Sequence, residues 1–260
     1  MMTIDLYNYD LFPVFLASLA VTFAASEVGR RLGARTADGG GTNISTLESA
    51  ILALLALMIG FTFAMALSRF ESRREAVLNE ANAIGTTALR ARLLPAPHRA
   101  EALTLLREYV KIRLDITQRV PSPKEMDAAI ARSNEIHEAL WQQAKAAATK
   151  DSGMVPTGLF IQALNEMIDN QETRLTAVRN RVPTIVVIAL YAIATVASGF
   201  TGYASGLEAR RPRLPANITM ILICAVILLI QDLDRPRAGF ITTSQQPMVD
   251  AAASIAGYTD

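Results

Sequence analysis

Charged side chains that could do chemistry are concentrated in residues 71–181, but their spacing is not that of an active site. Glu71 and Glu75 lie four residues apart, and Arg73 and Glu80 lie seven apart, so each pair falls on one face of a helix. Charges of both signs along a helix are typical of a solvated face. No carboxylate pair stands out as a general acid and base, so we expect no catalytic residue and no enzymatic activity.

The sequence also lacks the usual motifs for metals and cofactors. The single cysteine, Cys224, lies in an apolar run, and two histidines, His98 and His137, are too few for a histidine-rich metal site. The glycine-rich segment TADGGGTNIST, residues 36–46, follows no strand and has no lysine after Gly41. This favours a flexible loop over a phosphate-binding loop. We expect neither a metal nor another cofactor.

The composition indicates a protein that lies partly in a membrane and partly in water. Hydrophobic residues make up 51% of the 260 residues, and charged residues make up 19%. The net charge of +1 gives no reason to expect a nucleic-acid partner.

Four apolar runs predict four transmembrane helices. A helix needs about 20 apolar residues to cross a bilayer. The runs cover Leu11–Ala25, Ser49–Leu67, Val182–Ser205 and Ile218–Ile230, the last of which spans only if Leu214–Asn217 belong to it.

Two of these runs have alternative interpretations. The first run could be a signal peptide, but no lysine or arginine precedes it, and Asp5 and Asp10 lie there instead. The fourth run could be a buried core helix. Its short connection to the third run favours a helical hairpin through the membrane.

Arginines near the spans decide the orientation only weakly. Four spans place both termini and the middle region on one side. That side has eight arginines close to the membrane and the other side has six, which slightly favours the cytoplasm for the middle region. The eight are Arg69, Arg73, Arg74, Arg174, Arg179, Arg181, Arg235 and Arg237, and the six are Arg30, Arg31, Arg35, Arg210, Arg211 and Arg213.

The middle region is predicted to be helical. Breaks are expected at Pro95 and Pro97, at Pro121 and Pro123, and in a loop over residues 151–158. We expect the second and third membrane helices to continue into this region, with two shorter helices packed between them. The sequence shows no alternation typical of strands.

These predictions give an all-α membrane protein with four transmembrane helices in two pairs around a cytoplasmic helical region. The first helix pair is assigned to residues 1–70, the helical region to 71–181, the second pair to 182–232 and a cytoplasmic tail to 233–260.

The segment GFTFAMALSRFESRR, residues 60–74, resembles the pore helix of the bestrophins. Gly60-Phe61 is followed, eight residues after the phenylalanine, by Arg69-Phe70. QDLDRPRAG, residues 231–239, resembles the acidic stretch after the last membrane helix of that family. Longer segments, among them RFESRREAVLNEANAIGTTALRARLLPAPHR, SEVGRRLG and LDRPRAGFITTSQQP, are similar to a bacterial bestrophin-like family, and this likeness covers most of the chain.

The resemblance implies a homopentamer in the bacterial inner (plasma) membrane that conducts small inorganic ions through one axial pore. Ala53, Leu57 and Phe61 match the pore neck, and their spacing of four places them on one helix face. A ring of such side chains can gate by dewetting. Arg69, Phe70 and Glu71 then match the cytoplasmic exit of the pore helix. The implied partners are the lipid bilayer and the ions.

The post-helix acidic stretch departs from the bestrophin pattern. Only Asp232 and Asp234 remain of the acidic run. The tail continues with Arg235, Pro236, Arg237, Ala238 and Gly239, where bestrophins keep Pro-Phe-Gly after more acid. Two carboxylates supply too few oxygens for the roughly six to eight that calcium takes. We therefore expect no metal at this stretch.

Simpler interpretations of these residues stay open. Ala53, Leu57 and Phe61 could face lipid or a neighbouring helix. Arg69 and Glu71 could be anchors at the membrane surface, and the two aspartates could be a polar stop after the fourth span. The whole chain could instead be a dimeric signalling or scaffold protein whose helical bundle binds a soluble partner.

Overall fold

The computed structural model describes residues 9–36, 41–118, 121–150, 155–207, 213–236 and 239–258. The regular structure in these ranges is helical throughout. The helices are α1 (Leu11–Arg35), α2 (Gly41–Ala91), α3 (His98–Gln118), α4 (Pro123–Lys150), α5 (Val155–Arg179), α6 (Thr184–Leu207), α7 (Arg213–Asp234) and α8 (Gln246–Ala256).

The chain divides into two compact units. Unit 1 comprises residues 1–70 and 181–242, and unit 2 comprises residues 71–180 and 243–260. The 51 residues of α2 form one continuous helix that contributes its first part to unit 1 and its second part to unit 2. The prediction that the second membrane helix continues without a break is therefore confirmed.

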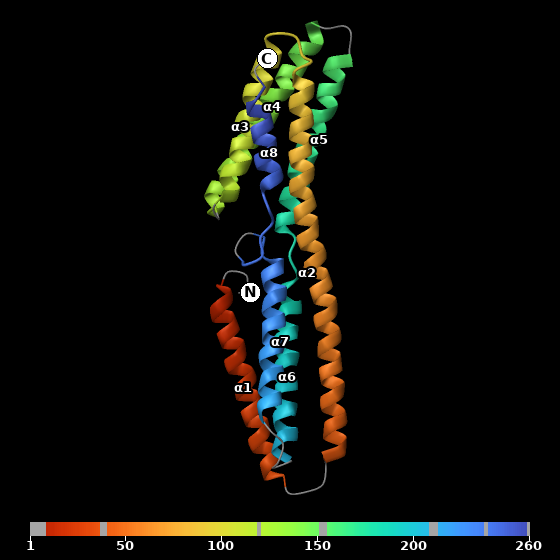
Figure 1. Cartoon of the computed structure of the whole chain (residues 1–260), viewed down its shortest axis with the longest axis vertical. Coiled ribbons are helices and arrows are strands. Elements are labelled where there is room, and N and C mark those ends of the chain that lie inside the picture. Colours follow the sequence, from red (N-terminus) through yellow and green to blue (C-terminus); the bar gives the residue numbers. More distant parts are fainter. Residues whose placement is uncertain are drawn as a thin grey trace. The chain divides into compact units, whose positions relative to one another are not determined.

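Unit 1 contains the four helices that are long and apolar enough to cross a membrane, which are α1, the first part of α2, α6 and α7. α7 begins at Arg213, so Leu214–Asn217 do belong to the fourth predicted span. Within this unit α1, α6 and α7 lie side by side (Figure 1).

Glycines bring α1 and α6 into close backbone contact. A Cβ atom at Gly29 would collide with the carbonyl oxygen of Gly199, and one at Gly202 would collide with that of Ser26. Small residues allow this approach, which stabilises membrane helix pairs by van der Waals packing. The two helices run parallel, since Gly29 meets Gly199 and Gly33, one turn further, meets Tyr203.

An apolar core joins α2, α6 and α7 within unit 1. α2 contributes the buried side chains Leu55 and Ala66, and the other two helices contribute residues such as Leu190, Ala194 and Ile227. One face of α2 is therefore used for packing against the other helices of unit 1.

The third membrane helix does not continue into the middle region, contrary to the prediction. α5 ends at Arg179 and α6 begins at Thr184. Proline disfavours a helical conformation at the residue before it and has no N–H for the helix ladder. Pro183 therefore breaks the helix, and the N–H of Val182 donates to Asp234 Oδ2 at 2.8 Å instead of to a helical carbonyl.

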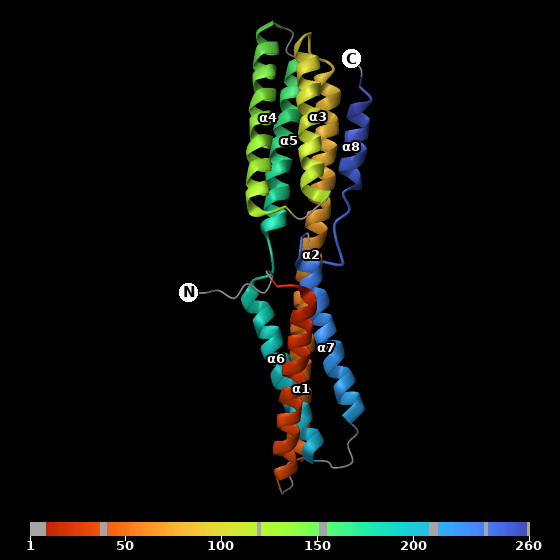
Figure 2. The same ribbon diagram turned by 90° about the vertical axis from the view of Figure 1, so that its left-hand side faces the viewer.

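Unit 2 packs α3, α4, α5, α8 and the second part of α2 around one apolar core (Figure 2). The breaks expected at the two proline pairs are confirmed. α4 starts at Pro123 with a capping box, in which Ser122 Oγ accepts from the N–H of Glu125 at 3.3 Å. Glu125 Oε2 accepts from the N–H of Ser122 at 2.8 Å. Leu106 and Leu140 are among the fully buried residues.

Some local predictions need correction. α2 already begins at Gly41, so the second half of the expected glycine-rich loop is helical, and α5 begins at Val155 inside the expected 151–158 loop. α8 was not expected in the tail. Met248 and Ile255 lie on one face of α8 and are buried in the core of unit 2. Residues 37–40 and 151–154, Arg210, Arg211, Arg237 and Ala238 lie outside the described residues.

Candidate functional site

The predicted neck residues form an exposed apolar face on α2. Phe61 is 67% exposed and Leu57 is 56% exposed, and Ala53 is exposed as well. The opposite face of the same helix carries the buried residues Leu55 and Thr62. The structure thus places the three predicted residues together, on the face of α2 that does not pack against the other helices of unit 1.

The predicted exit residues follow this face by two to three turns. Phe70 packs against the apolar core of unit 1, and Arg69 Nη2 lies 3.5 Å from the sulfur of Met65. Glu71 is exposed to solvent. These three residues do not share one environment, because the helix turns them toward different sides.

Asp232 is buried and holds the loop after α7. Its Oδ1 atom accepts from the N–H of Phe240 at 2.8 Å, and its Oδ2 atom accepts from the N–H of Ile241 at 3.0 Å. A Cβ atom at Gly239 would collide with Asp232 Oδ1, so any larger residue there would have to displace the carboxylate or the loop. Both oxygens therefore bind the chain itself.

Asp234 is also buried and connects the end of α7 to the start of α6 through the N–H of Val182. The next residue, Arg235, donates from Nη2 to the carbonyl oxygen of Tyr9 at 2.5 Å. The two aspartates are therefore not an exposed polar stop. They take part in the folding of the segment that follows the fourth span.

No group of three or more histidine, cysteine, aspartate and glutamate side chains comes together within the described ranges. Cys224 is buried, with its sulfur 3.7 Å from Thr22 Oγ1. It packs as a small side chain between α7 and α1.

A buried polar cluster in unit 2 was not predicted. Glu80 of α2 is fully buried and forms ion pairs with Arg113 of α3, at 2.7 Å, and with Arg174 of α5, at 2.6 Å. Tyr109 donates its hydroxyl to Glu80 Oε1 at 2.9 Å, and Arg174 Nη2 donates to Gln245 Oε1 at 2.8 Å. The prediction that Glu80 belongs to a solvated face is therefore wrong.

A signal for this cluster is present in the sequence. Arg113 continues the apolar series of Leu106 and Val110 on α3, and Arg174 lies seven residues after the buried Met167 on α5. A charged residue at a core-facing position has to find a partner, because burying an unpaired charge is costly. The spacing marks such positions but does not say which helices supply the partners.

The cluster shifts the pKa values of its members. Burial raises the pKa of the Glu80 carboxyl, but the two guanidinium groups outweigh this effect, so the pKa lies below its ordinary value. Burial and the carboxylate raise the pKa of Tyr109 well above its usual range. Burial, together with nearby Arg113, lowers the pKa of His137 to about 4. The imidazole of His137 lies beside Tyr109, with 5.0 Å between the ring centroids.

Comparison with known protein families gives one match over most of the chain. The family described as a bestrophin-like domain matches residues 16–248. No curated protein sequence matches the chain significantly.

Solved structures of similar fold include those of a bacterial bestrophin homologue from Klebsiella pneumoniae. One point variant of that protein has a TM-score of 0.67 at 16% identity, and the match covers 95% of this chain and 99% of that one. A second crystal structure has a TM-score of 0.64 at 17% identity and covers 93% and 95% of the two chains. The predicted resemblance and the all-α fold with four long apolar helices are confirmed by these matches.

Proposed function

Since the chain belongs to the bestrophin-like family of multi-pass membrane proteins, whose members are generally channels rather than enzymes, we propose that it is an ion channel. In this proposal five copies surround one axial pore, and small inorganic ions pass through it down their gradient. Ala53, Leu57 and Phe61 of α2 line the neck of that pore.

The exposed apolar face of α2 is the observation that carries this proposal. α2 uses one face, with Leu55 and Ala66, to pack inside its subunit. The other face presents Phe61 and Leu57, which are more than half exposed. Around a symmetry axis such faces would form an apolar constriction that gates ions by dewetting. The neck itself carries no charge, so selection between ions would have to arise elsewhere along the path.

The proposal assigns the rest of the chain as follows. Residues 1–70 and 182–232 supply the two helix pairs in the bacterial plasma membrane, and residues 71–181 form the cytoplasmic helical region. The tail, 233–260, and both termini lie in the cytoplasm. Arg69, Phe70 and Glu71 mark the exit of α2 from the membrane, while Asp232 and Asp234 organise the segment after α7 rather than bind calcium.

The first test is the oligomeric state of the detergent-purified protein, measured by native mass spectrometry. A pentamer is expected. Wild type is then compared with Phe61→Ala in planar bilayer recordings. Removing the ring widens the neck and lowers the dewetting barrier, so the variant is expected to pass a larger current.

Phe12→Ala is the matched control, because Phe12 on α1 is 68% exposed, almost the same as Phe61. Its current should equal that of wild type. A monomer or dimer under mild conditions would leave no axial neck and would favour the signalling or scaffold alternative. Equal currents in wild type and Phe61→Ala pentamers would contradict the assignment of Phe61 to the neck.

A further inference from the structure

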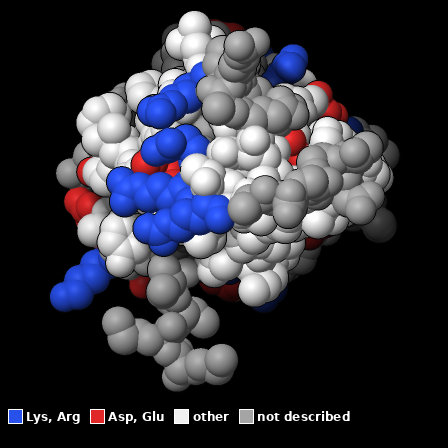
Figure 3. Space-filling model, turned by 90° about the horizontal axis from the view of Figure 1, so that it is seen from below, with Lys and Arg blue, Asp and Glu red and all other residues white. Residues whose placement is uncertain are grey.

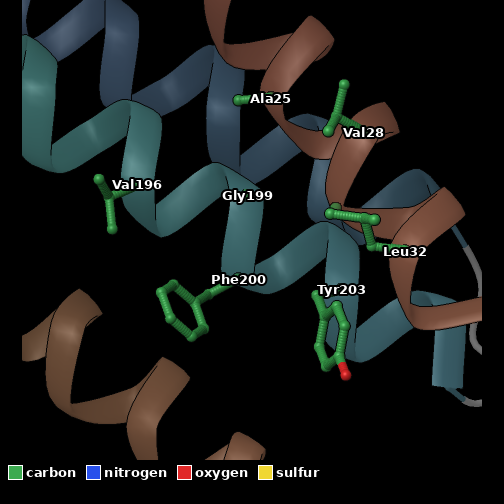
Figure 4. Close-up of a pocket in the computed structure, with 8 residues that line it drawn as sticks. Ala25, Val28, Leu32, Val196, Gly199, Phe200 and Tyr203 are labelled. Atoms are coloured by element: carbon green, nitrogen blue, oxygen red, sulfur yellow. The ribbon is translucent and has the colours of Figure 1, made fainter. Parts of the chain in front are cut away.

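An open apolar groove runs along the contact of α1 and α6 in unit 1. Its volume is about 410 Å³. Gly29 and Gly199 lie at its floor, where the backbones of α1 and α6 approach each other closely. Val28 and Leu32 of α1 line one wall, and α6 lines the other (Figure 4). The α6 residues that line this wall are Val196, Phe200 and Tyr203.

The groove has one polar end. α1 and α6 run parallel, and Leu32 and Tyr203 lie closest to the ends of their helices at Arg35 and Leu207. The hydroxyls of Tyr203 and Thr36 lie 3.1 Å apart there. The other end of the groove, at Ala25 and Val196, is wholly apolar. The groove thus has the polarity of an amphiphile with one charged end.

Two arginines of α1, Arg31 and Arg35, follow the groove toward this polar end. Arg35 follows Val28 by seven residues and Leu32 by three, which places it on the same face of α1 as the groove wall. Its side chain is exposed and has no ion pair among the described residues. Arg31 is 68% exposed and contacts Glu27 at 2.8 Å. Seen from this end of the helices, basic side chains gather on one part of the surface (Figure 3).

The charge at this end of unit 1 is positive. In the described part of the chain, Arg30, Arg31, Arg35 and Arg213 lie here against the two acids Glu27 and Glu48. An anionic surface attracts such arginines with an energy that grows with their number. An uncharged partner would gain nothing from them.

The position of the groove along the membrane normal fits a lipid. About 20 residues of a helix cross the hydrocarbon core, so a span that begins at Leu11 leaves the core near Arg31. Arg31 and Arg35 then lie at and just beyond the edge of the core, and the groove extends from Leu32, at that edge, inward to Ala25. At 1.5 Å per residue this is roughly 10 Å along the helix.

We propose that this groove binds one acyl chain of an anionic phospholipid, and that Arg35 and Arg31 hold the lipid phosphate at its polar end. The chain packs on the glycine floor between Val28 and Phe200. A protein helix from a second copy could also cover apolar surface, but its contacts would not require a single charged end at headgroup depth.

The experiment is a lipid titration of the detergent-purified protein followed by native mass spectrometry. Phosphatidylglycerol is compared with phosphatidylcholine that has the same acyl chains. Wild type is expected to retain phosphatidylglycerol preferentially. Glycerol phosphate, which has the charged group but no acyl chain, should leave no bound adduct. Equal retention of the two lipids, or binding of glycerol phosphate, would overturn the proposal.

Two sets of variants, one at the polar end and one in the apolar groove, separate the parts of the site. Arg35→Gln should weaken binding of phosphatidylglycerol about fivefold, the effect of one arginine at an anionic surface. Arg213→Gln removes an exposed arginine at the same end, outside the groove, and should weaken binding clearly less than Arg35→Gln does. Equal losses in both variants would indicate attraction to a diffuse positive surface and would contradict a defined site.

Gly199→Leu fills the groove from its floor. A Cβ atom there meets only the carbonyl oxygen of Ala25 at 3.8 Å, an ordinary contact, so the helix pair can stay intact. Val28→Trp fills the groove from its wall and serves as the second variant. Both should lose bound lipid, while Ala20→Leu, on an exposed part of α1 outside the groove, should keep it. Retained lipid in both filled variants would overturn the proposal. It would also be overturned if wild type bound no lipid and the filled variants had a different oligomeric state from wild type.

Discussion

Glu80 Oε2 lies 2.6 Å from Nη1 of Arg174, and both side chains are buried in unit 2. This ion pair connects α2 to α5, and both of its charges are buried away from water. Arg113 of α3 supplies a second guanidinium, which forms another ion pair with the Glu80 carboxylate. Such a buried network tolerates the loss of one member poorly, because the remaining charges keep their desolvation cost.

Glu80→Gln is therefore expected to destabilise unit 2 by about 3–5 kcal/mol, the usual cost of leaving a buried partner uncompensated. Trp141, the only tryptophan of the chain, packs against the core of unit 2, so its fluorescence reports on the unfolding of this unit. Guanidinium unfolding of the purified chain measures the loss. Glu75→Gln, at an exposed position of the same helix, should unfold as wild type does. Equal midpoints for Glu80→Gln and wild type would contradict a stabilising role of the network.

Unit 2 is expected to lose stability in acid through His137. Its pKa is about 4 in the folded protein, against about 6.5 in an unfolded chain. Between these two pKa values His137 therefore binds a proton in the unfolded chain but not in the folded protein. The contribution of His137 is present above pH 6.5 and is lost as the pH falls toward 4, by about 3 kcal/mol at most.

The unfolding midpoint, followed by Trp141 fluorescence from about pH 7 to about pH 4, tests this expectation. This range covers the pKa values of His137 in the unfolded and folded chain. His137→Gln should flatten the dependence. His98→Gln removes the other histidine and should leave it steep, because His137 is still present. The lowered pKa of Glu80 acts in the same direction at lower pH, since its stabilisation is present above the unfolded pKa and is lost as the carboxylate becomes protonated.

Gly239→Ala is expected to release the loop after α7. The added Cβ collides with Asp232 Oδ1, so the N–H groups of Phe240 and Ile241 lose their acceptor. Hydrogen exchange of these two amides should become faster, by an amount equivalent to about 1–3 kcal/mol for each lost bond to the charged group. Asp232→Asn should have a smaller effect, since one oxygen remains. Asp115→Asn, exposed on α3, is the control, and unchanged exchange in Gly239→Ala would refute the close packing of this loop.

Gly202→Val is expected to separate α1 from α6, because its Cβ meets the backbone of Ser26, which cannot move without displacing the helix. The fraction of monodisperse protein that survives heating, measured by size-exclusion chromatography, should fall sharply. Gly199→Ala, one turn earlier on the same helix, has only an ordinary contact and should survive as wild type does. Equal survival of Gly202→Val would mean that the helix contact is looser than its glycines indicate.

Local features of the sequence were sufficient to predict most of the helices. Apolar runs of spanning length mark the four membrane helices, since a bilayer demands internal hydrogen bonding and apolar surface over about 20 residues. Prolines at Pro97 and Pro123 mark helix boundaries because their effect on the backbone is local. Pro183 carried the same information, but the apolar and charged pattern around it suggested a continuous helix.

For the predicted neck residues, too, one part could be predicted from the sequence and another part required the tertiary structure. The helical spacing of Ala53, Leu57 and Phe61 is a property of α2 alone, so the sequence could place them on one face. Whether that face is covered by other helices of unit 1 is decided by the packing of α2 against α6 and α7, which uses the opposite face.

The sequence by itself determined the four spans, the uninterrupted helix α2 and the shared face of Ala53, Leu57 and Phe61, because each depends on neighbours along the chain. Only the tertiary structure decided that α1 pairs with α6, that Asp232 and Asp234 hold backbone amides, and that Glu80 is buried between two arginines. The partners in these contacts are far apart in sequence. A charge has the same local pattern whether it faces water or a partner from another helix, and only the packing of the helices distinguishes the two.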